Sequence, residues 1–377
     1  MTREFIEPGA VRHLPTVLAE LDARRVVLVA GDQAYKDSGA WDVLEPILER
    51  YQVTRFAEFT HNPKLEEALS AVARLRDASP DVVLAVGGGS TLDMAKLVNT
   101  LAHQRASPEA VVKGEVPVES TGLPMIAVPT TAGTGSEATQ FAVVYVGDVK
   151  YSLAHPSMLP AVAVVDAKLT YSMGPALTAA TAFDALSQAL ESYWAVKATR
   201  ESQSYAAHAI RLILPNVERA VHQPDPPSRA AMSQAANLAG KAINISRTTA
   251  AHALSYAFTI HWDIPHGHAV GLTLGSFMEL NAATERFAVN DPRGAEYVRA
   301  TLSALLELLG QPSPQHARQF LYELMSKLGL ETRLARLGIA RDVDLERVVD
   351  NVNLERLGNN PLQVSREALL ETLHGLV

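Results

Sequence analysis

The chain has 377 residues, and its 41 acidic and 33 basic side chains leave a formal net charge of −8 at pH 7. This balance argues against a general nucleic-acid-binding protein, which needs a basic face, and the lack of cysteine excludes disulfides, zinc-thiolate sites and thiol nucleophiles. An apolar share of 47% without a signal-peptide pattern or a membrane-length apolar run leads us to expect a soluble, cytoplasmic protein that has no membrane partner.

Four short apolar runs in the first half predict buried strands. They are residues 25–30, 82–86, 125–128 and 161–165. Between them, stretches such as 65–77 carry the 3.6-residue apolar period of a helix. Short strands without polar alternation, separated by helices, indicate an α/β domain with a parallel sheet covered on both faces.

The composition changes near residue 172. Beyond it, periodic segments rich in Ala and Leu predict helices over 179–196, 202–222, 228–245, 248–259, 297–308 and 315–328. We therefore expect two domains, an α/β domain over residues 1–172 and an all-helical domain over 173–377. Gly174 and Pro175 mark the boundary between them.

Three adjacent glycines follow the second predicted strand and lead into a helix. The residues of interest are Gly87, Gly88, Gly89, Ser90, Asp93 and Lys96. Glycines without Cβ atoms would let a pyrophosphate approach the backbone amides at the helix N-terminus, and Lys96 could reach back to an anion. The alternative is a tight strand-to-helix turn that binds no ligand.

A second loop, residues 129–137, follows the third predicted strand and contains the hydroxyl groups of Thr130, Thr131 and Thr134. Two such loops at strand ends are typical of a doubly wound sheet, whose ligand crevice lies beyond the carboxyl ends of its strands. Asp32, just after the first strand, could accept a hydrogen bond from an adenosine ribose, or it could be an ordinary turn residue. The loops differ from the common G-x-G-x-x-G pattern.

Metal-ligating residue types recur in the second half. Asp184 and Gln188 are four residues apart on a predicted helix, so they share a face. His252 opens another helical stretch, and His266 follows 14 residues later. A carboxylate with two imidazoles is a common divalent-metal set. We interpret His261 and His268 as ordinary surface or helix-end histidines, with a proton-relay role as the alternative.

These motifs together resemble the iron-containing (group III) alcohol dehydrogenase family over nearly the whole chain. They are Gly87–Ser90 with Asp93 and Lys96, the 129–137 loop, Asp184-Ala185-Leu186, His252-Ala253-Leu254 and Pro265-His266-Gly267. The resemblance implies a dehydroquinate synthase-like architecture, a homodimer, and hydride transfer in a cleft between the domains. It implies binding of NADH (or NADPH), with Lys150 at the nicotinamide ribose. It also implies a divalent metal, iron or zinc, held by Asp184, Gln188, His252 and His266.

Two positions depart from the family pattern. Gln188 stands where relatives usually have a histidine, and an amide oxygen is a weaker ligand for iron or zinc than imidazole is. Tyr256 stands where many members have another histidine near the substrate, and its phenol could donate a hydrogen bond to the reacting oxygen. With these replacements, the expected catalytic residues are Asp184, His252, His266 and Tyr256.

A polar segment just before His252 points to the substrate. It contains Lys241, Asn244, Ser246 and Arg247, where alcohol-reducing relatives have mostly small apolar residues. Cationic side chains beside alanines are costly unless an anion occupies the site. Arginine suits a phosphonate, phosphate, sulfonate or carboxylate through paired hydrogen bonds. The alternative is a surface salt bridge to a nearby acid.

Within the family, residues 151–156 and the stretch ending at Trp194 are most similar to the phosphonoacetaldehyde reductases. This similarity implies reduction of a small anionic aldehyde, phosphonoacetaldehyde, to 2-hydroxyethylphosphonate in phosphonate natural-product biosynthesis. The alternatives are a sulfoacetaldehyde or semialdehyde reductase, a dehydroquinate synthase-like lyase, and a degenerate member that only binds dinucleotide.

Overall fold

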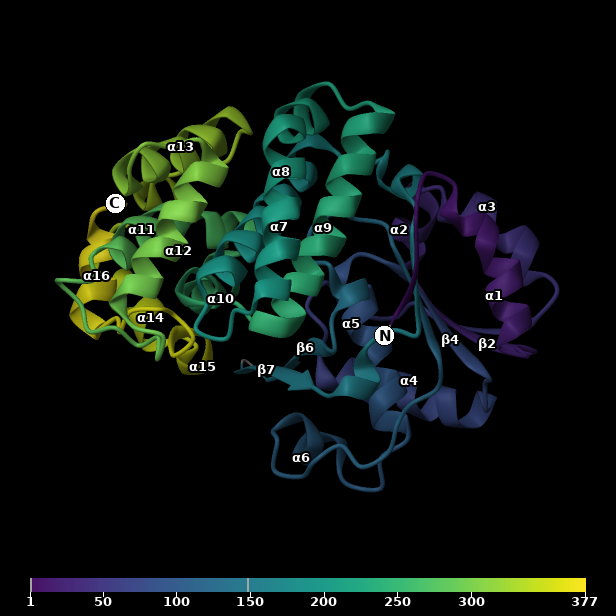
Figure 1. Cartoon of the computed structure of the whole chain (residues 1–377). Coiled ribbons are helices and arrows are strands. Elements are labelled where there is room, and N and C mark those ends of the chain that lie inside the picture. Colours follow the sequence, from purple (N-terminus) through teal and green to yellow (C-terminus); the bar gives the residue numbers. More distant parts are fainter. Residues whose placement is uncertain (1, 148) are drawn as a thin grey trace. The chain divides into compact units, whose positions relative to one another are not determined.

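The computed structural model describes residues 2–147 and 149–377. The chain divides between Met173 and Gly174 into two compact units, drawn in Figure 1. Among the described helices, none combines the length and the apolar character needed to cross a bilayer.

The first unit contains a six-stranded sheet in the order β1-β8-β5-β4-β2-β3, and every pair of neighbours is parallel. Its strands are β1 (Arg3–Ile6), β2 (Arg25–Val29), β3 (Gln52–Phe56), β4 (Val82–Gly87), β5 (Met125–Pro129) and β8 (Val162–Val165). An antiparallel hairpin is formed by β6 (Phe141–Val146) and β7 (Val149–Ala154). The predicted parallel sheet is confirmed. The β6–β7 hairpin was not predicted, and neither were β1 and β3, because partly exposed edge strands lack a continuous apolar run.

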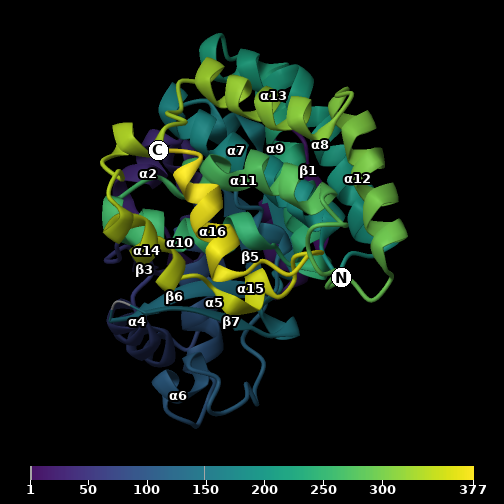
Figure 2. The same ribbon diagram turned by 90° about the vertical axis from the view of Figure 1, so that its left-hand side faces the viewer.

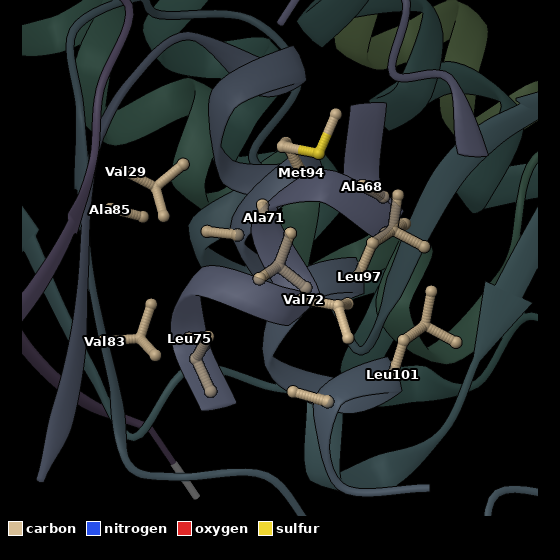
Figure 3. Close-up of a cluster of buried hydrophobic side chains, with 14 of the residues drawn as sticks. Val29, Ala68, Ala71, Val72, Leu75, Val83, Ala85, Met94, Leu97 and Leu101 are labelled. Carbon is tan, nitrogen blue, oxygen red and sulfur yellow. The ribbon is translucent and has the colours of Figure 1, made fainter. Parts of the chain in front are cut away.

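Helices cover both faces of this sheet. They are α1 (Leu14–Glu20), α2 (Asp32–Asp37), α3 (Ala40–Leu48), α4 (Leu65–Ala78), α5 (Gly89–Ala102) and α6 (Pro108–Val112). Because side chains alternate along a strand, Val29 packs with α4 and α5, while its neighbour Leu28 packs with α1 and α3. Figure 3 shows Val29, Val83 and Ala85 of the sheet beside the apolar side chains of α4 and α5. This core supports the loops at the strand ends.

The second unit is helical. Its helices are α7 (Pro175–Trp194), α8 (Arg200–His222), α9 (Pro226–Ser246), α10 (Ala250–Trp262), α11 (His266–Ala282), α12 (Ala295–Leu309), α13 (Pro314–Lys327), α14 (Asp342–Asp350), α15 (Leu354–Leu357) and α16 (Arg366–His374). The six helices predicted from periodicity are present. The prediction missed α14, α15 and α16, and it missed α11, which is buried on almost every side and so has no amphipathic period. It packs against α7, α10, α12, α13 and α16 (Figure 2).

Candidate functional site

The triple-glycine loop packs directly against the hydroxyl-rich loop. A Cβ atom on Gly89 would lie 2.6 Å from Thr134 Cγ2, and one on Gly88 would lie 3.3 Å from Thr131 Cγ2. The two loops follow β4 and β5, which are neighbours in the sheet. The glycines are therefore required for contact between the loops, in addition to any role in leaving phosphates room.

The strand order places the triple-glycine loop, which follows β4, at a reversal point of the sheet. From β2 the chain continues to β3 on one side, and then to β4 on the other side of β2. Ligands of such sheets bind beyond the strand ends at this point. Asp32 is exposed at the start of α2, and Ser90 is half-buried in the first turn of α5. Thr130 is buried, whereas Thr131 and Thr134 are half-buried.

Lys96 does not reach toward a bound anion, and that part of the sequence interpretation is wrong. Its side chain is buried, and its Nζ donates to Ser136 O at 2.6 Å and Oγ at 2.9 Å, to Thr139 Oγ1 at 2.9 Å and to Phe141 O at 3.0 Å. Burial lowers the pKa of Lys96 to about 8, although the charges of Asp93 and Glu137 oppose this shift. The ammonium therefore holds the 136–141 segment against α5.

Asp93, which lies on α5 like Lys96, also bonds this segment. Its Oδ1 accepts from Ser136 Oγ at 2.7 Å, and its Oδ2 accepts from the Val143 backbone N–H at 2.9 Å. Burial raises the pKa of Asp93, against the lowering effect of Lys96 and of Lys150 on β7. Both carboxylate oxygens thus bond the protein, and a direct contact of Asp93 with a cofactor stays a prediction.

In the second unit, three helices bring together the predicted metal ligands. Asp184 on α7, His252 on α10 and His266 on α11 each offer one ligand atom, and these atoms all lie within 4.8 Å of one another. Asp184 Oδ1 is 3.5 Å from His252 Nε2 and 3.9 Å from His266 Nε2. Residues that lie up to 82 positions apart in the sequence therefore form one cluster.

Gly267 explains how α11 can begin so close to α7. A Cβ atom at this position would lie 2.0 Å from Ala180 O and 2.8 Å from Asp184 N. Such distances leave no room for any side chain. The glycine beside His266 is thus the contact that brings the first turn of α11 to Asp184.

The amide nitrogen of Gln188 is hydrogen-bonded to the protein, whereas its amide oxygen has no hydrogen-bond partner among the described residues. Its Nε2 donates to Asp184 Oδ1 at 3.0 Å. Within residues 2–147 and 149–377, the buried Gln188 Oε1 and His252 Nε2 have no hydrogen-bond partner. A buried oxygen and a buried imidazole nitrogen without partners, beside Asp184 and His266, are the donor set that a divalent cation requires. The residues present therefore fit the metal implied by the sequence resemblance.

Glu191 is a functional residue that the sequence analysis missed. It is fully buried, its Oε2 bonds His252 Nδ1, and its Oε1 accepts from Thr249 Oγ1 at 2.7 Å and from the Ala251 N–H at 2.9 Å. A carboxylate on Nδ1 fixes the imidazole ring and leaves Nε2 for the cluster. The spacing could have revealed it, because positions 184, 188 and 191 recur on one helical face.

The charges in the cluster shift two pKa values. Burial alone raises the pKa of Asp184, but the neighbouring imidazoles of His252 and His266 lower it below its ordinary value. Burial alone lowers the pKa of His252, but Glu191 and Asp184 raise it to about 9. A cation bound by these residues would therefore have to displace a proton from His252.

Tyr256, His261 and His268, the other candidates for proton transfer, lie in different surroundings. The Tyr256 ring stacks on His266, with 6.2 Å between the ring centroids, so this tyrosine adjoins the cluster. His261 is exposed beside Trp262. His268 is buried with its Nε2 2.6 Å from Glu331 O, and burial lowers its pKa. This bond directs His268 Nε2 toward the segment after α13, and a proton-relay role for this residue stays a prediction.

The residues of the predicted substrate segment have different surroundings in the structure. Lys241 Nζ lies over the Tyr205 ring of α8, 5.7 Å from its centroid, and Asn244 is half-buried one turn further along α9. Ser246 is fully buried, and its hydroxyl bonds Ser192 Oγ at 2.7 Å. The prediction that Ser246 binds substrate is therefore wrong, because the protein uses this hydroxyl to join α7 and α9.

Arg247 occupies the turn between α9 and α10 in a strained conformation. Its φ of 63° and ψ of 175° lie in a region that glycine occupies almost exclusively. Such strain costs about 1–3 kcal/mol and persists only where surrounding contacts impose it. The side chain is half-buried, and burial lowers the pKa of its guanidinium. This residue lies five positions before His252.

Two family profiles together match most of the chain. The profile described as "Iron-containing alcohol dehydrogenase" matches residues 2–167, and the one described as "Fe-containing alcohol dehydrogenase family, C-terminal" matches residues 178–377. These matches correspond to the α/β unit and to the helical unit.

Individual relatives agree with the profiles. The chain is 33% identical over 323 residues to a phosphonoacetaldehyde reductase of Streptomyces viridochromogenes, covering 81% of this chain and 79% of that protein. It is 29% identical to an NAD-dependent methanol dehydrogenase of Bacillus methanolicus, with 93% of each chain covered. A sulfoacetaldehyde reductase of Bifidobacterium kashiwanohense, solved with NAD+, has a TM-score of 0.87 and 28% identity, covering 100% of this chain and 96% of that chain.

Proposed function

Because this chain belongs to the iron-containing alcohol dehydrogenase family, we propose that it reduces a short aldehyde with an anionic head group, using NADH. Phosphonoacetaldehyde is the substrate we favour, and 2-hydroxyethylphosphonate is the product. Hydride from NADH reaches the carbonyl carbon and a proton reaches its oxygen, so that the aldehyde is reduced while NADH leaves as NAD+. The observation that carries this choice is the half-buried guanidinium of Arg247, five residues before His252.

The loops of the first unit support NADH binding. The N-terminus of α5, preceded by Gly88, offers backbone N–H groups and a positive dipole end to the pyrophosphate. We assign Thr130, Thr131 and Thr134 to the nicotinamide half, and Lys150 to its ribose. The exposed carboxylate of Asp32 is assigned to the adenosine ribose, where its charge disfavours the 2′-phosphate of NADPH. The relative solved with NAD+ agrees with this preference.

The cluster in the second unit supports a metal-assisted reaction. Asp184, Gln188, His252 and His266 would hold the divalent cation, iron or zinc. When bound, such an ion acts as a Lewis acid toward a carbonyl oxygen. Glu191 keeps the His252 ring in place, and the two buried atoms without protein partners, Gln188 Oε1 and His252 Nε2, support this assignment.

Tyr256 is the side chain we assign to proton donation. Its ring stacks on His266, so it belongs to the same group of residues as the cluster. A phenol hydroxyl at this position can donate a hydrogen bond to the carbonyl oxygen as negative charge develops during hydride transfer. Water then restores the proton.

Arg247 is assigned to the head group. A guanidinium donates two parallel hydrogen bonds to a phosphonate, which fixes the other end of a two-carbon aldehyde for hydride transfer. The strained backbone of this residue supports a functional role, since strain of this kind concentrates at binding and catalytic sites.

A substrate panel tests the proposed function. The panel contains phosphonoacetaldehyde, sulfoacetaldehyde, succinate semialdehyde and propanal, each assayed with NADH and NADPH. We expect the highest kcat/KM with phosphonoacetaldehyde, and Arg247→Gln should lower its ratio to propanal about 10- to 100-fold, the value of a charged hydrogen bond. The control is Arg366→Gln, an exposed arginine paired with Asp350. A wild type that prefers propanal, or equal losses on both aldehydes, would refute the proposal.

Sulfoacetaldehyde is the second candidate substrate. The similarity to a sulfoacetaldehyde reductase over the whole chain favours it. A sulfonate also accepts paired hydrogen bonds from a guanidinium, but it carries one negative charge instead of the two of a fully ionised phosphonate. The same panel separates the two, because the better head group gives the lower KM.

A further inference from the structure

Hydrogen bonds to the backbone hold the strained turn at Arg247 on both sides of that residue. The amide nitrogen of Asn359 donates to Ser246 O at 2.8 Å and to Thr248 O at 3.0 Å. The Arg247 N–H donates to Ile243 O at 2.9 Å, and the Arg247 carbonyl accepts from Ser246 Oγ at 2.9 Å. A φ of 63° at a residue other than glycine persists only where surrounding contacts impose it. Asn359 supplies two such contacts from a distant part of the chain.

Asn359 is itself fixed by the segment that follows α7. Its side-chain oxygen accepts from the Lys197 N–H at 3.1 Å, and its backbone carbonyl accepts from the Val196 N–H at 3.0 Å. The buried amide thus uses its oxygen as an acceptor and its nitrogen as the donor of two bonds. These bonds allow one orientation of the amide, because exchanging its oxygen and nitrogen would place acceptors against acceptors. Asn359 therefore joins the end of α7 to the turn.

The other end of the turn is attached to the metal-ligand cluster by a separate set of bonds. The Thr249 N–H donates to Glu191 Oε1 at 3.2 Å, and Glu191 Oε2 bonds His252 Nδ1. These bonds do not involve Asn359. A change at Asn359 should therefore release Arg247 and leave His252 held by Glu191.

We propose that Asn359 is a positioning residue, which acts through Arg247 to place its guanidinium on the anionic head group of the substrate. Without the two amide bonds, nothing from Asn359 opposes relaxation of Arg247 to an ordinary negative φ, and such a rotation redirects its Cα–Cβ bond. Asparagine suits this position because one small planar group supplies two N–H donors and one acceptor. This inference rests on the proposed function, in which Arg247 binds the head group.

A double-mutant cycle tests whether Asn359 acts through Arg247. We expect Asn359→Ala to lower the ratio of kcat/KM for phosphonoacetaldehyde to that for propanal about tenfold, mainly through the KM of phosphonoacetaldehyde, because a charged hydrogen bond is misplaced. Zinc affinity should be unchanged, since Glu191 still holds His252. In the Arg247→Gln protein the same substitution should leave the ratio where Arg247→Gln alone has set it, because the two residues serve one interaction.

Asn99→Ala is the matched control for the loss of a buried amide. Asn99 and Asn359 are both 4% exposed, and the Asn99 amide bonds Leu123 O at 2.8 Å and Leu123 N at 2.9 Å in the α/β unit. This variant should lose stability without a change in the aldehyde ratio. Asn359→Ser keeps one hydroxyl donor in place of two N–H groups, so we expect a smaller fall in the ratio, and it serves if Asn359→Ala does not fold.

A binding measurement supplies a readout independent of turnover. Calorimetry with methylphosphonate and the NAD+-loaded protein should show weaker binding in the Asn359 variants and unchanged binding in Asn99→Ala. Equal losses on phosphonoacetaldehyde and propanal, additive effects of Asn359→Ala and Arg247→Gln, or unchanged methylphosphonate binding would overturn the role of Asn359.

Failure of this inference is distinguishable from failure of the proposed function. If Arg247→Gln removes the preference for phosphonoacetaldehyde and the Asn359 variants retain it, only the positioning role of Asn359 is refuted. A wild type without preference for anionic aldehydes refutes the proposed function, and the positioning role with it.

Discussion

The Glu191 carboxylate holds His252 by both its side chain and its backbone. Its Oε2 bonds the His252 Nδ1, while its Oε1 accepts from the His252 backbone N–H at 3.3 Å. The same Oε1 accepts from Thr249 Oγ1, which in turn accepts from Trp194 Nε1 at 2.9 Å. A single buried carboxylate therefore caps the start of α10 and orients the imidazole in the metal-ligand cluster.

Replacing Glu191 with Gln should weaken metal binding. The amide no longer supplies the negative charge that orients His252 and increases its basicity, and loss of such an outer carboxylate typically lowers metal affinity 10- to 100-fold. Titration of the metal-free protein with zinc, followed by calorimetry, measures the change. Glu279→Gln, which removes a partly exposed partner of Arg318, is the control. Equal zinc affinity in the Glu191→Gln variant and the wild type would contradict this role.

Replacing Gln188 with His should strengthen binding of zinc and ferrous iron. Imidazole is a better ligand than an amide oxygen for both ions, and position 188 already lies beside Asp184. We expect at least about a tenfold gain in affinity, visible as more metal per chain after dialysis against a weak chelator. The control Gln319→His adds an exposed histidine on α13. A variant with the same metal content as the wild type would show that Gln188 lies outside the ligand set.

Replacing Gly267 with Ala should destabilise the helical unit. The added Cβ would meet the Ala180 carbonyl at 2.0 Å, so α7 and α11 must separate. We expect a loss of about 3 kcal/mol in the free energy of unfolding, measured by urea denaturation, together with weaker metal binding. Gly174→Ala is the matched control, because a Cβ atom at that position meets nothing within 4 Å. Equal stability of the two variants would refute the packing argument.

Lys96 should make stability depend on pH in the alkaline range. Its pKa is about 8 in the folded protein, against an ordinary value of 10.5. Between these values the unfolded chain binds more protons, so the contribution of Lys96 to the free energy of unfolding rises with pH, by about 3 kcal/mol in total. Below pH 8 both states are protonated and this contribution is constant.

The difference in unfolding free energy between the wild type and Lys96→Met measures this effect. Denaturation at intervals from pH 7 to 10 should show the difference moving in favour of the wild type above pH 8. A difference that stays constant, or that moves in favour of the variant, would contradict the lowered pKa. Lys113→Met, which removes a partly exposed lysine paired with Glu109, is the control.

The central strands and the amphipathic helices were predictable because each carries its own pattern. The apolar run of β4 and the helical period of α4 each lie within one short stretch of consecutive residues, and the structure contains both elements. The helix α11 has no such pattern, since it is buried on almost every side. Predicting it requires knowledge of the helices packed around it.

The candidate site likewise contains residues that could be predicted from the sequence and residues that could not. Asp184, His252 and His266 were identified because their residue types have the chemistry of metal ligands, and the fold brings them together. The sequence by itself determined the two-part architecture, the glycine-rich loops and these candidate ligands, because periodicity and residue chemistry are local properties. Only the tertiary structure decided that Glu191 orients His252, that Ser246 bonds Ser192, and that Lys96 bonds the 136–141 segment. These roles depend on hydrogen bonds and charges between segments distant in the chain, and no short stretch of sequence contains both partners.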